Sequence, residues 1–466
     1  MSVTMKKVLL VAPSYSFIYQ GAKIQPGAMY SPSLGIAAVA GALLAAGHEV
    51  RICDLNKRTE ADLLRELREF APDYAGISFT TVLAAEAGRL AGLIKKESPK
   101  TLVMAGGVHA SSMPEDTLSC ADIDYAFIGE ADFSAPEVVS GKPLPEVAGL
   151  AYREGGKIVV NPRRELICDL DTLPYPAWNL FDVPSYSTTR LLTRANPAGW
   201  LETSRGCPYG CVYCNKSVFG RGFRVKSAER VVEEIAYMLR CGFKEIHIAD
   251  DCFTVDLDRA KRICRGILGR GLKFPWATVT GIRADRVDQE LLDLMKAAGC
   301  YRIFYGIESG SDEVLKRIGK GETLAQVRAA VTMAKKAGLE VHGFFMLALP
   351  GDTEKTMRAT IDFAKELDLD MAKAAITIPL PATPYFEELS AAGRIKSRDW
   401  SKYNLYFPAS TLYDHPTLSW DLVEEYYKKF YREFYFRPGY ILKRLVESVR
   451  SGRLLHDIGV FLRVKW

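Results

Sequence analysis

The sequence predicts an α/β protein: a doubly wound parallel sheet, then a partial (β/α)6 barrel, then a mainly helical C-terminal region. Apolar strand-like runs alternate with helix-like runs twice, before residue 150 and again after residue 196. Such alternation indicates parallel strands joined by right-handed crossovers. A proline-rich stretch separates the two series. We therefore predict an N-terminal domain at 1–150, a linker at 151–195, a barrel at 196–385 and a basic, helical region at 386–466.

The predicted strands of the first domain end in small or polar residues. The strands are Val8–Ala12, Glu49–Cys53, Tyr74–Phe79, Thr101–Ala105 and Tyr125–Ile128, with helices between them. Ligands of such open sheets bind at the carboxyl ends of the strands. Ser78–Thr81, Gly106–His109 and Gly129-Glu130 stand at three of those ends, where small residues let a large flat ligand approach the backbone.

The second series contains six strand–helix units after the linker, which itself includes a hairpin-like stretch near Tyr152–Val160. Its strands are Trp200–Thr203, Glu245–Ala249, Trp276–Gly281, Tyr301–Ile307, Val341–Leu347 and Ala374–Ile378. Six units predict a smaller relative of the eight-fold barrel, whose active site lies at the carboxyl ends of the strands.

Composition narrows the class of protein. The chain has 466 residues, 48% hydrophobic and 25% charged, which is typical of a globular protein. It has no apolar run of membrane-spanning length and no signal-peptide core, so we expect a cytoplasmic protein. Seven of its ten cysteines are scattered, which disfavours a disulfide framework. Residues 428–466 carry a net charge of +7 and residues 1–427 a net charge of −2.

Three cysteines cluster as Cys207-Pro-Tyr-Gly-Cys211-Val-Tyr-Cys214, directly after a predicted strand. Three thiolates on one loop bind three irons of a [4Fe–4S] cluster and leave the fourth iron open to a chelating ligand. The alternative is a zinc loop, but structural zinc takes four protein ligands, and no fourth Cys or His is near in sequence. We predict that Cys207, Cys211 and Cys214 bind an iron–sulfur cluster.

This loop resembles the C-x3-C-x-aromatic-C signature of the radical S-adenosylmethionine superfamily, with Tyr213 at the aromatic position. The resemblance implies that S-adenosylmethionine binds the open iron and is cleaved to a 5′-deoxyadenosyl radical. It also implies an external electron donor of the flavodoxin or ferredoxin type.

Three later segments resemble cofactor motifs of the same superfamily. Asp250-Asp251 matches a polar motif at the end of the second barrel strand, although helix capping is an equal alternative. In Gly306-Ile307-Glu308-Ser309-Gly310, the resemblance implies that Glu308 binds the ribose hydroxyls, with Ser309 beside it. Leu347 begins a segment that resembles the loop near the adenine.

The first domain resembles the cobalamin-binding domain that precedes many enzymes of this superfamily. The resemblance implies cobalamin contacts at the strand ends, by Ser78, Thr80, Thr81, Gly106, Gly107, Val108, His109, Gly129 and Glu130. The chain lacks the Asp-x-His-x-x-Gly motif that supplies an axial histidine in many cobalamin proteins. That absence leaves the lower face of the cobalt to Thr81, Val82 or Leu83. For His109 we expect a contact to the corrin periphery or, equally, a satisfied loop histidine.

The C-terminal region has aromatic residues at i, i+4 spacing between lysines and arginines, from Tyr426 to Tyr435. This pattern predicts a core stripe covered by solvated cations. The alternative is a basic amphipathic surface that rests peripherally on anionic lipid. The run Phe436–Leu442 resembles radical enzymes that act on hopanoids and other apolar substrates. Nucleic acid ranks last as a partner, because no RNA-binding module is recognisable.

Together these features favour a cobalamin-dependent radical enzyme that methylates an unactivated carbon of a small or apolar substrate. A first alternative is radical cyclisation, oxidation or rearrangement of a lipid or porphyrin without methyl transfer. A tRNA methylthiotransferase would need a second cysteine set, which Cys53, Cys120 and Cys168 do not form. A non-enzymatic cobalamin or iron–sulfur sensor is the last alternative.

Overall fold

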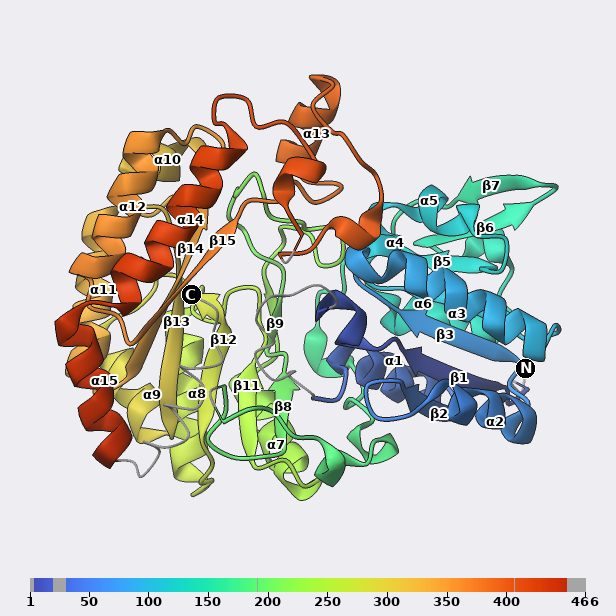
Figure 1. Cartoon of the computed structure of the whole chain (residues 1–466). Coiled ribbons are helices and arrows are strands. Elements are labelled where there is room, and N and C mark those ends of the chain that lie inside the picture. The colour runs from blue at the N-terminus through green and yellow to red at the C-terminus, as the bar shows by residue number, and fades with distance from the viewer. Residues whose placement is uncertain (1–3, 20–30, 191, 406, 451–466) are drawn as a thin grey trace.

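The computed structural model describes residues 4–19, 31–190, 192–405 and 407–450. Figure 1 shows two α/β units side by side, with the C-terminal helices along the outside of the second. Within the described part of the chain, no helix is both long and apolar enough to cross a membrane.

The first unit is a seven-stranded sheet of order β2-β1-β3-β4-β5-β6-β7. Its parallel strands are β1 (Lys7–Ala12), β2 (Glu49–Asp54), β3 (Tyr74–Ser78), β4 (Leu102–Gly106) and β5 (Tyr125–Phe127). Two antiparallel strands, β6 (Leu150–Glu154) and β7 (Lys157–Val160), extend the sheet. They form the hairpin expected near Tyr152–Val160. Its turn residues Gly155 and Gly156 both have positive φ, as a two-residue hairpin turn requires.

Helices cover both faces of this sheet, which confirms the predicted doubly wound fold. One core joins Leu9 and Val11 to α2 (Glu60–Phe70) and α3 (Ala84–Glu97). The other joins Val8 and Leu10 to α1 (Leu34–Ala45) and α6 (Ala131–Val139). Two short helices, α4 (Val108–Ser112) and α5 (Pro114–Ser119), follow β4. In Figure 1, β1 and β3 run toward the centre of the molecule.

The second unit is a six-stranded parallel sheet of order β15-β14-β13-β12-β11-β8, which confirms the partial barrel. Its strands are β8 (Ala198–Leu201), β11 (Glu245–Ile248), β12 (Trp276–Ile282), β13 (Cys300–Glu308), β14 (Glu340–Leu347) and β15 (Met371–Ile376). The helices between them are α7 (Ala228–Arg240), α8 (Leu257–Gly269), α9 (Gln289–Ala297), α10 (Asp312–Arg317), α11 (Leu324–Lys336) and α12 (Glu354–Glu366). A two-stranded ribbon, β9 (Ser204–Arg205) with β10 (Arg224–Val225), follows β8.

Side chains alternate between the two faces of the barrel strands. Ile303, Tyr305 and Ile307 of β13 belong to the core shared with the helices, and so do Phe345 and Leu347 of β14. The residues between them, such as Phe304, Gly306 and Phe344, point to the opposite face, which we call the inner face. The inner face is therefore turned away from the helices.

The C-terminal helices complete the second unit. They are α13 (Pro384–Ala391), α14 (Trp420–Tyr435) and α15 (Pro438–Arg450). Tyr426, Phe430 and Phe434 of α14 are buried in the barrel core, which confirms the aromatic core stripe. The hydroxyls of Tyr431 and Tyr435 donate to the carbonyls of Ala374 and Ala372 at 2.8 Å and accept from the N–H groups of the same residues. Helix α14 thereby occupies the hydrogen-bonding groups on the open side of edge strand β15.

Candidate active site

The three clustered cysteines lie on the loop that follows β9. All are free thiols; Cys214 is exposed, and Cys207 and Cys211 are partly buried. The loop begins at Gly206, whose φ is +83° and where an added Cβ would lie 2.3 Å from the Gly222 carbonyl oxygen. Because glycine has no Cβ, the backbone just before Cys207 can turn and pass close to the Gly222 carbonyl, next to β10. A residue with a side chain would clash there.

The chemistry of these thiols fits an iron–sulfur cluster. The surrounding protein disfavours the thiolates by desolvation, which raises the pKa of Cys211 and raises the pKa of Cys214 to about 11 even though Cys214 reaches solvent. Metal binding would therefore displace protons from these thiols. Within the described ranges, no three His, Cys, Asp or Glu side chains converge on a single-ion site. A four-iron cluster needs no such convergence, because each thiolate binds a different iron.

Asp250 and Asp251 hold the backbone that leads into the cysteine loop. The Asp250 carboxylate accepts hydrogen bonds from Thr203 N at 2.5 Å and from the hydroxyls of Thr203 and Ser204. Asp251 accepts from Gly206 N at 3.1 Å. The helix-capping alternative is wrong, because Asp256 caps α8. The two predicted residues therefore position the loop from behind.

Tyr213 and Glu308, predicted from separate motifs, lie together in the structure. Burial raises the pKa of Tyr213 well above its ordinary value, and the adjacent Glu308 carboxylate adds to the rise. Glu308 has a φ of +67°, a conformation rarely adopted by residues other than glycine. Its carboxylate accepts from Lys320 Nζ at 3.1 Å. The end of β13 thus presents a buried carboxylate beside the cysteine loop.

Sequence reasoning missed a set of charged residues around this carboxylate. Lys320 also lies 3.8 Å from Glu322, which in turn lies 3.5 Å from Arg283. The Arg283 guanidinium stacks on the Tyr209 ring at 3.4 Å, and Tyr209 belongs to the cysteine loop. Tyr209, Arg283 and the pair Lys320 and Glu322 are far apart in the sequence and belong to no recognised motif, so only the fold could reveal the group.

Ser309 and Leu347 lie beside the site rather than in it. The Ser309 hydroxyl accepts from Ser311 N at 3.2 Å, within the turn that leads to α10. The Leu347 side chain belongs to the core that the barrel strands share with the helices. Met346 and Leu349 instead share an apolar cluster with Tyr213. A contact of Ser309 or Leu347 with adenosylmethionine stays a prediction.

The strand ends of the first domain form an open, small-residue surface. Apart from Gly106 and its chain neighbours, no atom of a described residue lies within 4 Å of where a Cβ of Gly106 would be. Gly107 has a φ of +97°, and its Cβ would meet the Phe79 carbonyl oxygen at 2.5 Å. The buried hydroxyl of Thr80 has no hydrogen-bond partner in the described structure. This surface fits a large ligand, with Ser78, Thr80, Thr81 and Val108 around it as predicted contacts.

His109 points into the protein interior. It is fully buried, its Nε2 lies 3.2 Å from an Asp116 oxygen, and its ring centroid lies 5.5 Å from that of Trp400. Trp400 Nε1 donates to the same Asp116 oxygen at 2.9 Å. Only Nε2 of His109 is paired, because its buried Nδ1 has no partner among the described residues, so the expectation of a satisfied histidine is met in part. A contact with the corrin periphery stays a prediction. The cluster also attaches the C-terminal region to the first domain.

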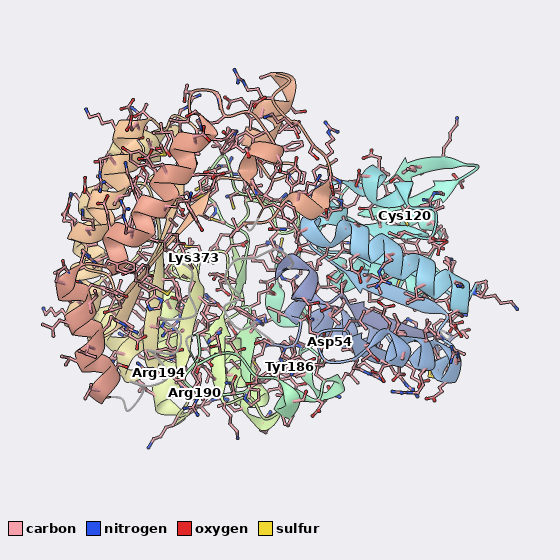
Figure 2. All side chains as sticks on the ribbon, in the orientation of Figure 1. Asp54, Cys120, Tyr186, Arg190, Arg194 and Lys373 are labelled. Carbon is pink, nitrogen blue, oxygen red and sulfur yellow. The ribbon has the colours of Figure 1, made fainter. Side chains whose placement is uncertain are left out.

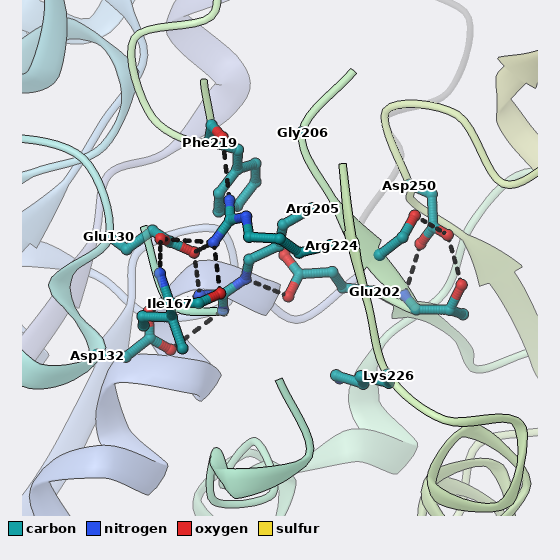
Figure 3. Close-up of polar contacts among 12 residues, drawn as sticks. Glu130, Asp132, Ile167, Glu202, Arg205, Gly206, Phe219, Arg224, Lys226 and Asp250 are labelled. Carbon is teal, nitrogen blue, oxygen red and sulfur yellow. Dashed lines mark hydrogen bonds and ion pairs between the residues drawn. The ribbon is translucent and has the colours of Figure 1, made fainter. Parts of the chain in front are cut away.

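Glu130 takes part in a buried ion-pair cluster between the two units (Figure 3). Arg205 contacts Glu130 at 2.9 Å, Asp132 at 2.8 Å and Glu202 at 2.7 Å. Arg224 binds both Glu130 oxygens at 2.8 Å. We call these five residues the interdomain cluster. Both oxygens of the Glu130 carboxylate are thus bound by arginines of the second unit. The contact of Glu130 with cobalamin stays a prediction.

The cysteine loop contacts the strand ends of the first domain directly. Asn215, next to Cys214, donates from Nδ2 to the Ser112 hydroxyl at 2.8 Å. Ser112 in turn bonds the Ser217 hydroxyl at 2.9 Å. Ser112 ends α4, the helix that begins just after Gly107. The predicted cluster-binding loop and the predicted cobalamin-binding surface are therefore neighbours.

Comparison with known proteins identifies both units. The Radical SAM superfamily profile matches residues 201–364, and the B12 binding domain profile matches residues 27–139. An uncharacterized methyltransferase of Pyrococcus horikoshii is 35% identical over 89% of this chain and 90% of its own length. The anaerobic magnesium-protoporphyrin IX monomethyl ester cyclase of Rubrivivax gelatinosus is 27% identical over 97% of this chain and 84% of its own length.

Among solved structures, the cobalamin-dependent S-adenosylmethionine radical enzyme OxsB with aqua-cobalamin bound has the same fold. The TM-score is 0.76 at 19% identity, and the match covers 99% of this chain and 72% of that chain. The family's cofactors are a [4Fe–4S] cluster, S-adenosylmethionine and cobalamin. The chain belongs to the radical S-adenosylmethionine superfamily, in the subgroup whose members carry a B12 binding domain.

Proposed function

We propose that this radical enzyme transfers a methyl group to an unactivated carbon of a small or apolar substrate. When bound, the cluster and adenosylmethionine supply a carbon radical, and cobalamin supplies the methyl group. Cys207, Cys211 and Cys214 would hold the cluster. Ser78, Thr80, Gly106, Gly107 and Gly129 would face the corrin.

The observation that carries this proposal is the contact of Asn215 with Ser112. It supports a site in which the cluster loop and the strand ends of the B12 binding domain face one shared space. Reactions that use both cofactors on one substrate require that proximity. The methyltransferase name of the Pyrococcus relative supports the same assignment.

The test is anaerobic reconstitution with iron, sulfide and hydroxocobalamin, followed by reduction in the presence of adenosylmethionine. An external reductant is needed, and flavodoxin or ferredoxin would serve in the cell. We expect bound corrin, 5′-deoxyadenosine and S-adenosylhomocysteine. Cys211→Ala should abolish both products, whereas Cys168→Ala, at an exposed cysteine outside the loop, should not. Corrin without S-adenosylhomocysteine, in the presence of candidate substrates, would contradict methyl transfer.

The second candidate is a radical cyclase or oxidase without methyl transfer, which the cyclase name of the Rubrivivax relative favours. It predicts 5′-deoxyadenosine with no S-adenosylhomocysteine. The two functions therefore differ in a single nucleoside product, measured by chromatography of the same reaction.

We also infer that α15 contacts an anionic lipid surface. Its exposed apolar residues lie on one side at helical spacing: Ile441, Leu442, Leu445, Val446 and Val449. The net charge of +7 over residues 428–466 complements acidic headgroups. Leu442→Glu should reduce flotation with phosphatidylserine vesicles, and Leu268→Glu, at an exposed leucine of α8, should not. Equal flotation of both variants would contradict this contact.

A further inference from the structure

Lys373 lies on the inner face of the barrel, in the middle of β15 (Figure 2). Its neighbours Ala372 and Ala374 belong to the core shared with the helices, so Lys373 points the other way. In the parallel register Lys373 pairs with Phe344, and Phe344 pairs with Gly306. These three residues form one row across the inner face.

This row leads to the Glu308 carboxylate. An added Cβ at Gly306 would lie 2.8 Å from Glu308 Oε1 and 3.0 Å from Lys320 Nζ, so that ion pair stands directly over Gly306. Adjacent strands are about 4.8 Å apart. The backbone of Lys373 is therefore about 10 Å from that of Gly306, two strands away. A molecule that reaches from Glu308 across Phe344 would arrive at Lys373.

Lys373 makes no hydrogen bond or ion pair to any other residue that the structure describes, and its side chain is exposed. Burial nevertheless lowers its pKa, with no carboxylate to oppose the shift. Water therefore reaches the side chain, yet the surrounding protein still partly desolvates the ammonium group. A desolvated cation without a counter-charge is costly for folding, and such groups concentrate at functional sites.

The surface beside Lys373 is aromatic. The Phe344 ring stacks on the Phe304 ring with centroids 5.0 Å apart and planes 19° apart. His342 packs edge-on against Phe304 at 4.7 Å, and burial lowers the pKa of His342 well below its ordinary value, so it adds no positive charge. Lys320 and Arg302 also lie near this face, but they are paired with Glu308 and Glu340. Beside the aromatic residues, the described part of the inner face thus presents Lys373 as a cation without an ion-pair partner.

We propose that Lys373 binds an acidic group, a carboxylate or a phosphoryl group, of a substrate whose apolar body lies against the partly exposed Phe344 ring, which the buried Phe304 ring supports from behind. This assignment names the substrate class for the site and rests on the proposed function. Lys373 acts as a specificity-determining residue. An acidic substrate would contact both the aromatic residues and the Lys373 ammonium group, whereas a neutral analogue would contact the aromatic residues without an ionic partner.

The experiment uses the reconstituted holoenzyme and three probes with the same ring: 2-naphthoate, 2-naphthyl phosphate and 2-naphthylmethanol. Equilibrium dialysis with fluorescence detection gives the affinity of each. We expect the wild type to bind at least one acid about ten times more tightly than the alcohol, as a charge-assisted hydrogen bond provides. The acid that is preferred distinguishes a carboxylate from a phosphoryl substrate.

Lys373→Met should remove the preference for the acid, and Lys373→Arg should keep most of it. Lys273→Met, at an exposed lysine before β12, should behave as the wild type. The proposal is overturned if the wild type does not favour either acid, or if Lys373→Met keeps the preference. A change confined to adenosylmethionine affinity would also overturn it.

The iron content of each variant verifies that the barrel is folded. Loss of S-adenosylhomocysteine formation with intact, Lys373-dependent binding would count against the methylase and leave this inference standing. The converse result would count against Lys373 alone.

Discussion

We expect the binding of adenosylmethionine to depend on one residue, Glu308, through its carboxylate. Lys320 is its hydrogen-bonded cation at 3.1 Å, and Tyr213 lies on its other side. Glu308→Gln keeps the shape but removes the charge that makes hydrogen bonds to hydroxyls strong. We expect the KM for adenosylmethionine to rise about tenfold, measured from the rate of 5′-deoxyadenosine formation.

The matched control for this substitution is Glu313→Gln, at an exposed residue of α10. Its KM should equal that of the wild type. An unchanged KM in Glu308→Gln would show that the ribose is bound elsewhere.

Local motifs were sufficient to find the residues that lie together at the cysteine loop. Cys207, Cys211, Cys214, Tyr213 and Glu308 each belong to a short, specific pattern. The structure brings Tyr213 to Glu308, although 95 positions separate them in the numbering. The cations Lys320 and Arg283 belong to no pattern, because their role depends on the carboxylates that the fold brings near them.

At the scale of elements, α14 stabilises the barrel through two tyrosine hydroxyls. Tyr431→Phe and Tyr435→Phe keep the rings but leave the N–H and C=O groups of Ala374 and Ala372 without these partners. Each variant should lower the free energy of unfolding by about 1 kcal/mol, measured by urea denaturation. Tyr125→Phe, whose hydroxyl makes no hydrogen bond to a described residue, should have a smaller effect.

A second prediction concerns the ion pair between α12 and α14. Arg358 and Lys365 lower the pKa of Glu433 to about 2, from an ordinary value of 4.5. Because the folded pKa is lower than the unfolded one, the stabilisation is present above pH 4.5 and is lost as pH falls toward 2. Glu433→Gln should therefore cost about 1 kcal/mol at pH 7 and progressively less below pH 4.5.

The measurement is the difference in urea midpoint between wild type and Glu433→Gln at pH 7, 4 and 3. Glu425→Gln, in an exposed pair with Lys429 on the same helix, is the control and should change the midpoint little at any pH. A difference that stays constant with pH would contradict the ionic origin of the effect.

Elements with a strong period were predictable, whereas contacts between distant elements were not. The stretch near Tyr152–Val160 indicated a hairpin, but not that β6 would pair with β5 and extend the first sheet. Asp250 looked like a helix cap by position. The structure instead caps α8 with Asp256 and uses Asp250 to hold the end of β8, a choice set by tertiary packing.

At the scale of the whole molecule, the interdomain cluster joins the two units. Arg205→Met would leave the buried Asp132 without its cation, and an uncompensated buried charge costs about 3 kcal/mol or more. We expect the wild type to unfold in one thermal transition, and Arg205→Met to unfold at a temperature several degrees lower and in two separate transitions, measured by calorimetry. Arg262→Met, at an exposed residue of α8, is the control. An unchanged transition would mean that the two units unfold independently of this cluster.

This junction could not be predicted from the sequence. Glu130 follows a glycine at a strand end, which resembles a ligand-binding loop, yet its partner Arg205 is 75 residues away. His109 likewise pairs with a residue of its own domain while Trp400, from the C-terminal region, covers its ring. Which polar residues face a ligand and which face another domain is decided only when the domains meet.

The tyrosine hydroxyls on β15 also have a consequence for the order in which the chain is made. Strand β15 leaves the ribosome first, and the hydroxyl that covers Ala374 arrives 57 residues later. Throughout that interval the newly synthesised barrel carries an edge strand open to neighbouring nascent chains. Released chains truncated between Ile376 and Trp420 should therefore aggregate, whereas chains that retain α14 through Tyr435 should yield soluble barrels.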